Sequence, residues 1–533
     1  MNDHIDHDPD TRGSQIRDKS VLDLGVRSLV IQSLVGTILF WLLHIFMGWT
    51  LRYWGVWLPP GIGPDTVPVW AVWEPLLPNE WFLMAIVAFV WFIRVVPRMM
   101  ANQESPLLVL AILAAGYCLL STVSILIRGP GWNLSLMATF HSHAELLQSP
   151  FVWGHYYPDS FFEGSVRDFL REYPQRMGDQ TLHNTVHPPG GILVLRGVQA
   201  VWGDAIWSAA LVRTLFAAGC VIPIYGMGRD LFSHQAGLIG AALWVLSPAV
   251  LMHSGTSAEP FFALPVLLSM WIFSRCFEID DVKDRQQSRS ESWKRSACVG
   301  FLAGMMLFVA SMMTFSVAMI AVLFSLSVVR RIWIDHRRWI PEGGALLVTG
   351  LTCVVALTSL YLLTGFNYAE SLLEAIQNDR EALPWKKNPS LSYQAMVGTG
   401  NLSAFLLGTG MVSLCWWFRC ARHRHSKSTI DRRENPFGKV LPVILLFFSY
   451  GRFYSLETER IWIFLIPIIT VSVGYELTRC MRGERGMDTT WMPYMWPIKS
   501  CLWLGIVFLL IQGISELLKS YYAMTKGKWP GDK

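Results

Sequence analysis

Charged residues are scarce in this sequence. Asp, Glu, Lys and Arg make up 16% of the 533 residues, whereas hydrophobic residues make up 52%. The net charge is only +5 and the basic residues lie mostly in short segments, which argues for contact with a lipid surface and against a nucleic-acid partner. The apolar residues cluster into runs of membrane-spanning length instead of alternating as in a soluble core. The composition therefore predicts an all-α polytopic membrane protein.

Two further features are missing. The nine cysteines lie mostly within or beside apolar runs and form no Cys-x-x-Cys pair, so neither a zinc site nor a disulfide framework is indicated. The polar residues 1–20 include no apolar segment after a basic start, so we expect no cleavable signal peptide. We interpret residues 1–26 as a disordered cytoplasmic tail.

About thirteen apolar runs are predicted to cross the membrane, and an odd number places the two termini on opposite sides. Several runs are shorter than the roughly 20 residues that a full crossing needs. The runs 297–310 and 315–329 are therefore expected to form a hairpin whose tip stops below the outer surface, leaving a cavity in the outer leaflet. The predicted spans are 29–49, 81–96, 106–127, 205–227, 236–252, 260–273, 297–310, 315–329, 345–363, 402–418, 440–448, 461–473 and 501–514.

Lysine and arginine predict the orientation. If the N-terminal tail is cytoplasmic, four strongly basic segments fall on the same side, as the positive-inside rule requires. The opposite face then carries the long segment 128–204, which we expect to hold juxtamembrane helices. We expect chemistry on this extracytoplasmic face of a bacterial inner or plasma membrane. The basic segments are 275–295, 330–338, 419–439 and 479–499, and the other outer segments are 50–80, 253–259, 311–314, 366–401 and 451–460.

The polar stretch 156–203 is the best candidate for chemistry. At its centre stands Thr185-Val186-His187-Pro188-Pro189-Gly190-Gly191. The proline pair fixes φ at two successive positions and favours an extended His187, while the glycine pair lets a following helix begin close to its neighbours. A plain connecting turn is the alternative interpretation. The many acidic and basic residues of this stretch favour a rigid elbow at a functional site.

These residues resemble a known family. The His-Pro-Pro element, the short amphipathic segment 192–202, Gly203-Asp204 and Arg213 are similar to the protein O-mannosyltransferase and aminoarabinose transferase branch of the type C (GT-C) glycosyltransferases. The likeness covers roughly residues 124–329. It continues through Gly228-Arg229-Asp230-Leu231-Phe232, through Ala241-Ala242-Leu243-Trp244-Val245-Leu246-Ser247-Pro248 and through Ala303-Gly304.

The sequence departs from the family pattern in its first outer loop. Such enzymes usually carry an adjacent pair of acids there, whereas this loop holds only separate acids, and Asp159 and Glu163 precede the His-Pro-Pro element instead. We interpret residues 27–97 as a helix pair added ahead of a glycosyltransferase-like core, 98–329, that includes the outer loop 128–204. The C-terminal helices, 330–533, complete the expected organisation.

The resemblance implies transfer of a sugar from a polyprenyl-phosphate donor to an acceptor hydroxyl. A phosphate leaves without protonation, so one carboxylate as base and cations to hold the phosphate would suffice, with inversion at the anomeric centre. The expected partners are membrane lipid, this donor, and a glycan, lipid or protein acceptor. No cofactor is indicated; a divalent cation is compatible with carboxylates facing a phosphate, but no ligand spacing identifies one. The alternative function is a multi-pass transporter or flippase of a polar or lipid-linked solute.

Each candidate site residue also has a structural interpretation. Asp159 could be a solvated loop acid, Glu163 could belong to a surface helix with ion pairs, and His187 could cap a helix. Arg213 could form a structural ion pair in an apolar run, and Glu259 could complement a helix dipole. We expect Asp159 or Glu163, His187, Glu259 and Arg460 to line one cavity. The candidate catalytic residues are Asp159, Glu163 and His187, and the candidate substrate-binding residues are Arg213, Glu259, Lys386, Lys387, Glu457, Glu459 and Arg460.

Overall fold

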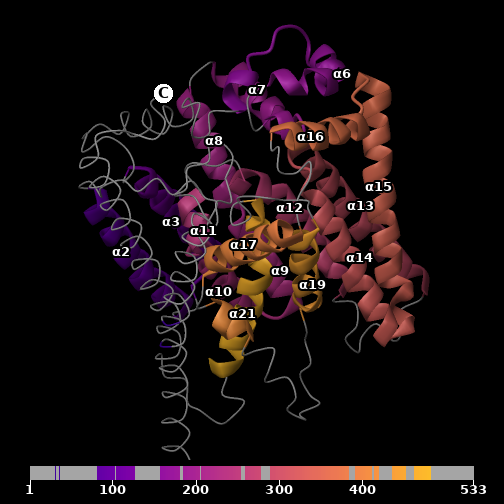
Figure 1. The fold of residues 1–533 in the computed structure, drawn as a ribbon. Coiled ribbons are helices and arrows are strands. Elements are labelled where there is room, and N and C mark those ends of the chain that lie inside the picture. The colour runs from indigo at the N-terminus through magenta and orange to yellow at the C-terminus, as the bar shows by residue number, and fades with distance from the viewer. Residues whose placement is uncertain are drawn as a thin grey trace, which may run out of the picture.

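The fold is helical throughout the part of the chain that the structure, a computed structural model, describes (Figure 1). That part comprises residues 31 and 35, 81–101, 104–126, 156–180, 184–203, 206–253, 259–277, 289–382, 391–410, 413–418, 435–451 and 461–481. The α-helices are α2 (Trp81–Ala101), α3 (Pro106–Leu126), α5 (Tyr156–Asp159), α6 (Val166–Arg176), α7 (Gly190–Trp202), α8 (Ile206–Gly219), α9 (Val221–Leu231), α10 (His234–Val245), α11 (Pro248–His253), α12 (Glu259–Ser274), α13 (Arg289–Met313), α14 (Val317–Ile334), α15 (Pro341–Thr364), α16 (Tyr368–Ala382), α17 (Leu391–Thr409), α19 (Pro436–Tyr450) and α21 (Ile466–Met481). The 3-10 turns are η1 (Met177–Asp179), η2 (Asn184–Val186), η3 (Arg275–Phe277), η5 (His336–Trp339) and η7 (Ile463–Leu465).

The protein is an integral membrane protein. Within the described residues, six segments are long and apolar enough to cross a bilayer, and four further apolar helices are shorter. The total of thirteen spans stays a prediction, because the expected spans 29–49 and 501–514 lie almost wholly outside the described residues. The six segments are Leu83–Met100, Pro106–Val123, Leu211–Leu231, Glu291–Met313, Val317–Ile334 and Pro341–Thr364.

Three expectations about individual spans are wrong. The runs expected at 297–310 and 315–329 are longer than predicted, since α13 has 25 residues and α14 has 18; α13 continues through the polar residues that precede its apolar run. The depth at which the tip of this pair stops stays a prediction. The expected span 236–252 is two helices, α10 and α11, separated before Pro248, whose ring cannot continue the helix. Asn401 lies inside α17, which begins at Leu391, and not in a loop.

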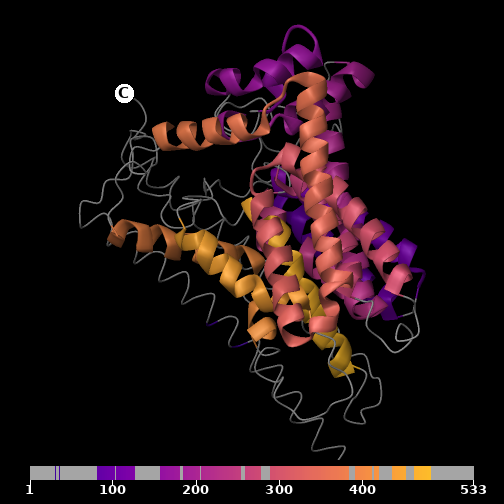
Figure 2. The ribbon, with the colours of Figure 1, turned by 90° about the vertical axis from the view of Figure 1, so that its right-hand side faces the viewer.

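The helices form two layers. Most of them build one bundle around a continuous apolar core that runs from α2 to α21. A smaller cap lies on one end of the bundle (Figures 1 and 2), and we call residues 156–190 the loop layer. A second apolar cluster joins this layer to the bundle, drawing on Phe169 and Tyr173 of α6, Phe262 of α12, Met312 of α13 and Phe366 after α15. The described parts of three segments assigned to one membrane face, 128–204, 311–314 and 366–401, therefore meet in this cluster.

α13 and α15 pack along much of their length through a Gly-x-x-x-Gly pair. A Cβ atom built on Gly300 would lie 2.6 Å from the Ala345 carbonyl oxygen, and one on Gly304 would lie 2.6 Å from the Thr349 carbonyl oxygen. Small residues are favoured between membrane helices because association there depends on close van der Waals packing, not on the hydrophobic effect. The two glycines thus set the separation of α13 and α15.

Replacing Gly304 by Ala should push the two helices apart. Overpacking of this kind costs about 1–3 kcal/mol, so the variant should unfold at lower denaturant concentration in mixed detergent micelles. Gly350→Ala, in α15, is the matched control: a Cβ there meets nothing within 4 Å, and alanine is favoured in a helix by roughly 1 kcal/mol. Equal stability of the two variants would contradict this account of the interface.

Candidate active site

The elbow before α7 is held against the bundle at very short range. A Cβ atom on Gly190 would lie 2.2 Å from the carbonyl oxygen of Met312, in the last turn of α13. A Cβ on Gly191 would lie 3.0 Å from the Tyr156 ring and 3.1 Å from that of Phe262. The expectation that the glycine pair allows a close helix start is confirmed.

His187 is positioned from both its backbone and its ring. Its carbonyl oxygen accepts a hydrogen bond from the Tyr173 hydroxyl at 2.8 Å, and the same hydroxyl donates to the Asn184 carbonyl oxygen at 3.3 Å. The imidazole lies edge-on to Tyr156, with ring centres 5.9 Å apart, and 6.0 Å from the ring of Phe262. Residues from α5, α6 and α12 thereby fix the elbow.

Asp159 is tied to the same turn. Its carboxylate accepts a hydrogen bond from the Asn184 side-chain amide, and it is half-buried at the end of α5. Burial, with a further contribution from the Asp159 charge, raises the pKa of the Tyr173 phenol well above its ordinary range. Tyr173 therefore remains a hydrogen-bond donor, and Asp159 lies close to the groups that hold His187.

A buried polar chain supports α5 from the side of α7. The Gln199 amide donates to the Ser160 hydroxyl at 2.6 Å, and that hydroxyl donates to the Tyr157 carbonyl oxygen at 2.5 Å. Gln199 and Ser160 are both buried. Because hydrogen bonds in a low-dielectric interior are directional and costly to break, this chain restricts the rotation of α5 and hence the position of Asp159.

A small apolar pocket lies beside the elbow, and the roughly 460 Å³ of non-atom space around it includes open solvent. Arg213 is its single charged wall residue, and its guanidinium interacts electrostatically with the Glu259 carboxylate at the start of α12. Both side chains are buried. Whether Arg213 has a structural or a functional role stays a prediction, and the pocket places its side chain near Tyr156 of α5 and Phe262 of α12, which pack against the elbow. The walls are Tyr156, Tyr157, Gly191, Val194, Leu195, Ala209, Val212, Arg213, Phe261 and Phe262.

Glu163 is not grouped with these residues. It is exposed and lies before α6, whose N-cap is Ser165. The surface-helix interpretation holds for the acids that follow: Asp168 and Glu172 both pair with Arg171, at 3.1 and 3.6 Å, and Glu172 also pairs with Arg176 at 2.5 Å.

The remaining candidates fall outside the described residues. These are Lys386, Lys387, Glu457, Glu459 and Arg460, so the expected cavity that includes Arg460 stays a prediction. Among the residues that are described, no three His, Cys, Asp or Glu side chains come together as a metal-binding group.

Sequence reasoning missed three residues that organise the site, namely Tyr173, Asn184 and Phe262. Tyr173 is fully buried although it lies on a charged helix, and its spacing of four from Phe169 was an available signal of an apolar stripe. Asn184 had no signal, because its role depends on Asp159, which lies 25 residues earlier in the chain. Phe262 joins the site only through the tertiary packing of α12.

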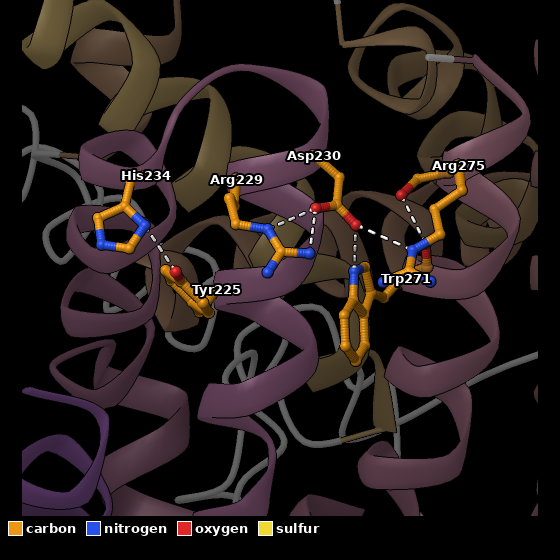
Figure 3. A network of polar contacts seen from close by, with 7 residues as sticks. Tyr225, Arg229, Asp230, His234, Trp271 and Arg275 are labelled. Atoms are coloured by element: carbon orange, nitrogen blue, oxygen red, sulfur yellow. Dashed lines mark hydrogen bonds and ion pairs between the residues drawn. The ribbon is translucent and has the colours of Figure 1, made fainter. Parts of the chain in front are cut away.

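A separate polar network lies further along α12 (Figure 3). The buried Asp230 carboxylate, at the end of α9, binds Arg229 at 2.5 Å, Arg275 at 3.0 Å and the Trp271 indole nitrogen at 2.7 Å. Trp271 comes nine residues after Phe262 on the same helix, a rise of about 14 Å. The network therefore ties α9 to η3 at the other end of the bundle and takes no part in the elbow.

The middle of the chain is similar to a known family of glycosyltransferases. Residues 186–363 match the family described as dolichyl-phosphate-mannose-protein mannosyltransferase. The match begins inside the His-Pro-Pro element and ends in α15, and it confirms the resemblance inferred from the sequence over this stretch. No curated protein sequence matches the chain significantly.

Solved structures of such enzymes resemble the chain distantly. ArnT from Cupriavidus metallidurans bound to undecaprenyl phosphate is 11% identical, with a TM-score of 0.40 over 73% of this chain and 78% of that one. The apo oligosaccharyltransferase of Archaeoglobus fulgidus is 10% identical, with a TM-score of 0.38 over 76% of this chain and 56% of that one. The chain thus spans about half the length of the oligosaccharyltransferase.

Removing the Tyr173 hydroxyl should loosen the elbow. Tyr173→Phe leaves two buried or half-buried carbonyl oxygens without this donor, which typically costs about 1–3 kcal/mol. Backbone amides of residues 184–187 should then exchange with deuterium faster, as measured by mass spectrometry. Tyr361→Phe, at an exposed position of α15, should leave this exchange unchanged. If both variants exchange at the wild-type rate, Tyr173 does not hold the elbow.

Proposed function

We propose that the protein transfers a sugar from a polyprenyl-phosphate donor to an acceptor hydroxyl at the loop-layer end of the bundle, on the extracytoplasmic face. The observation that carries the proposal is the apolar pocket beside Asp159 and His187 with one buried cation, Arg213, in its wall. An isoprenoid carrier is apolar and ends in an anion, and this pocket offers both kinds of surface. The family match, whose description names a lipid-phosphate mannose donor, supports the same donor class.

Asp159 is the proposed base. An acceptor hydroxyl becomes a better nucleophile as a carboxylate removes its proton, and attack on the side opposite the phosphate inverts the anomeric centre. The proton goes to Asp159 and the bonding electrons leave with the phosphate. A second catalytic acid is unnecessary, because the phosphate departs as an anion. The Asn184 amide orients the carboxylate by donating to it.

Arg213, accompanied by Glu259, is proposed to bind the phosphate of the sugar donor. The guanidinium would stabilise the negative charge that accumulates on the departing phosphate, and its effect is larger in an apolar, water-poor wall than in water. Glu259 keeps the buried cation compensated when no donor is bound. His187, packed between Tyr156 and Phe262, would contact the sugar or phosphate from the elbow.

Arginines at the end of the bundle opposite the loop layer support the proposal that the loop layer faces the extracytoplasmic side. Arg229 and Arg275 meet at Asp230, and Arg331 donates to the Phe277 carbonyl oxygen close by. Arg331 and Arg338 also share the buried Glu342 carboxylate, at 2.8 and 3.0 Å. Basic residues concentrate on the cytoplasmic side of membrane proteins, so the loop layer would face outward.

Asp159→Asn should lower turnover by about 10² to 10⁴ because the amide cannot act as a base. Purified protein would be given a panel of polyprenyl-phosphate sugars, with release of polyprenyl phosphate as the measured product. Asp179→Asn, an exposed acid of the same layer, should retain wild-type turnover. Unchanged turnover in Asp159→Asn would remove it from the site, and no release from any donor by the wild type would favour the transporter.

Cysteine labelling tests the orientation separately. A cysteine introduced at Asp179 in the loop layer should react with an impermeant maleimide on intact cells, whereas one at Lys294, at the start of α13, should need a permeant reagent. Both positions are exposed, and the unaltered chain corrects for its native cysteines. The reverse pattern would place the loop layer in the cytoplasm and overturn the proposed sidedness.

A further inference from the structure

The chain turns sharply at the end of α15 and enters a second helix. Gly365 ends α15 in the left-handed conformation, with φ of 84°, and its N–H donates to the Tyr361 carbonyl oxygen at 2.7 Å. The Asn367 side chain then accepts the Glu370 N–H at 3.2 Å and so begins α16. Phe366, fully buried between these ends, fixes the turn against Tyr173. α16 consequently runs crosswise to α15 and extends sideways from its end (Figure 2).

One face of α16 packs against the loop layer. Ser371 and Ala375 are buried, and the Asn378 amide donates to the Thr185 carbonyl oxygen at 3.0 Å. These three positions recur at helical spacing and therefore share one face. Gln175 of α6 adds a hydrogen bond to Glu370 at 2.8 Å. The Asn378 bond ends two residues before His187, so α16 directly supports the elbow.

The opposite face of α16 is apolar and uncovered up to Ile376, and the exposed Arg380 follows on the same face in the last turn. Leu372, Leu373 and Ile376 are 36%, 68% and 41% exposed. At about 100° per residue they form a stripe centred roughly 140° round the helix from the packed face. The stripe therefore faces away from the loop layer, toward the bundle side of α16. Exposed apolar surface of this kind needs a cover.

We propose that bilayer lipid covers this stripe, so that α16 is an interfacial helix on which the loop layer and its elbow rest. The stripe continues the exposed apolar surface of α15. α15 is a membrane span whose side chains are mostly exposed, and Leu362 and Leu363 in its last turn are 74% and 71% exposed. The stripe begins only nine residues after Leu363, on a helix that lies across the end of that span. An amphipathic helix in this position buries its apolar face at the boundary between head groups and acyl chains.

The charge of α16 shows which force would keep this helix at the membrane surface. The helix carries Glu370, Glu374, Asp379 and Glu381 against one basic residue, Arg380. Attraction to anionic lipids therefore contributes nothing favourable, and burial of the apolar stripe is the force that seats the helix. The interfacial position of α16 is independent of the reaction proposed above, since it concerns only the depth of the elbow relative to the membrane.

Photocrosslinking from the full-length protein tests whether the apolar stripe of α16 contacts bilayer lipid. A benzophenone amino acid placed at Ile376, on the stripe, should form an adduct with phosphatidylcholine in vesicles of that lipid alone. The same group at Glu381, five residues on and about 140° round the helix, is the matched control and should form at least several-fold less adduct. Leu373 provides a second stripe position should the Ile376 variant fold poorly. Replacing part of the phosphatidylcholine by phosphatidylglycerol should not increase the yield.

Three outcomes would overturn the proposal. Equal lipid capture at Ile376 and Glu381 would mean that the stripe has no preferred contact with the bilayer. Capture of another segment of this chain, or of a second protein, at Ile376 and Leu373 would identify a different cover. A lipid adduct that forms only when anionic lipid is present would mean that attraction to charge, not burial of the apolar stripe, holds α16 at the membrane.

Discussion

The structure depends most on the contact between the start of α7 and the tip of α13. The Cβ that any residue but glycine would carry at position 190 lies 2.2 Å from the Met312 carbonyl oxygen, which is far inside contact distance. Pro188 and Pro189 precede it and remove two backbone N–H donors from a turn that lies half in the protein interior. The elbow can therefore sit against the bundle without leaving buried donors unsatisfied. Every group placed at the site, from Asp159 to Arg213, is positioned relative to that contact.

The sequence predicted the features that depend on local chemistry or on composition. Apolar runs predicted a helical membrane protein, and the Pro-Pro-Gly-Gly pattern predicted a close-packed elbow. Prediction from the sequence failed for features that depend on tertiary contacts. α13 extends beyond its apolar run because its first turns need not lie in lipid, and α16 was assigned to a loop because its apolar stripe is short and its acids dilute the signal. The contact between Asn184 and Asp159 joins two positions that no helical or strand period relates.

The two ends of the bundle differ in how they treat charge. At the far end, Asp230 and Glu342 each accept two arginine side chains, and both carboxylates are almost fully buried. Buried pairs of this kind contribute little net stability, because desolvation offsets most of the attraction, but losing one partner is costly. They therefore act as ties that fix α9 to η3 and α14 to α15. At the loop-layer end the ion pairs of α6 are exposed, and exposed pairs contribute well under 1 kcal/mol. Packing of aromatic rings, not charge, orders that layer.

Arg213 differs from both groups because its pocket is apolar. A guanidinium in such a wall carries a permanent positive charge and five N–H donors in a fixed plane. Hydrophobic residues of similar volume would fill the space at less desolvation cost, so stability alone gives no reason for a cation at this position. An anion that enters the pocket from the elbow side would meet the guanidinium charge in a low dielectric, where electrostatic attraction is stronger than in water. In the function proposed above, this charge matches the anionic end of the donor, and the pocket and the elbow form parts of one site.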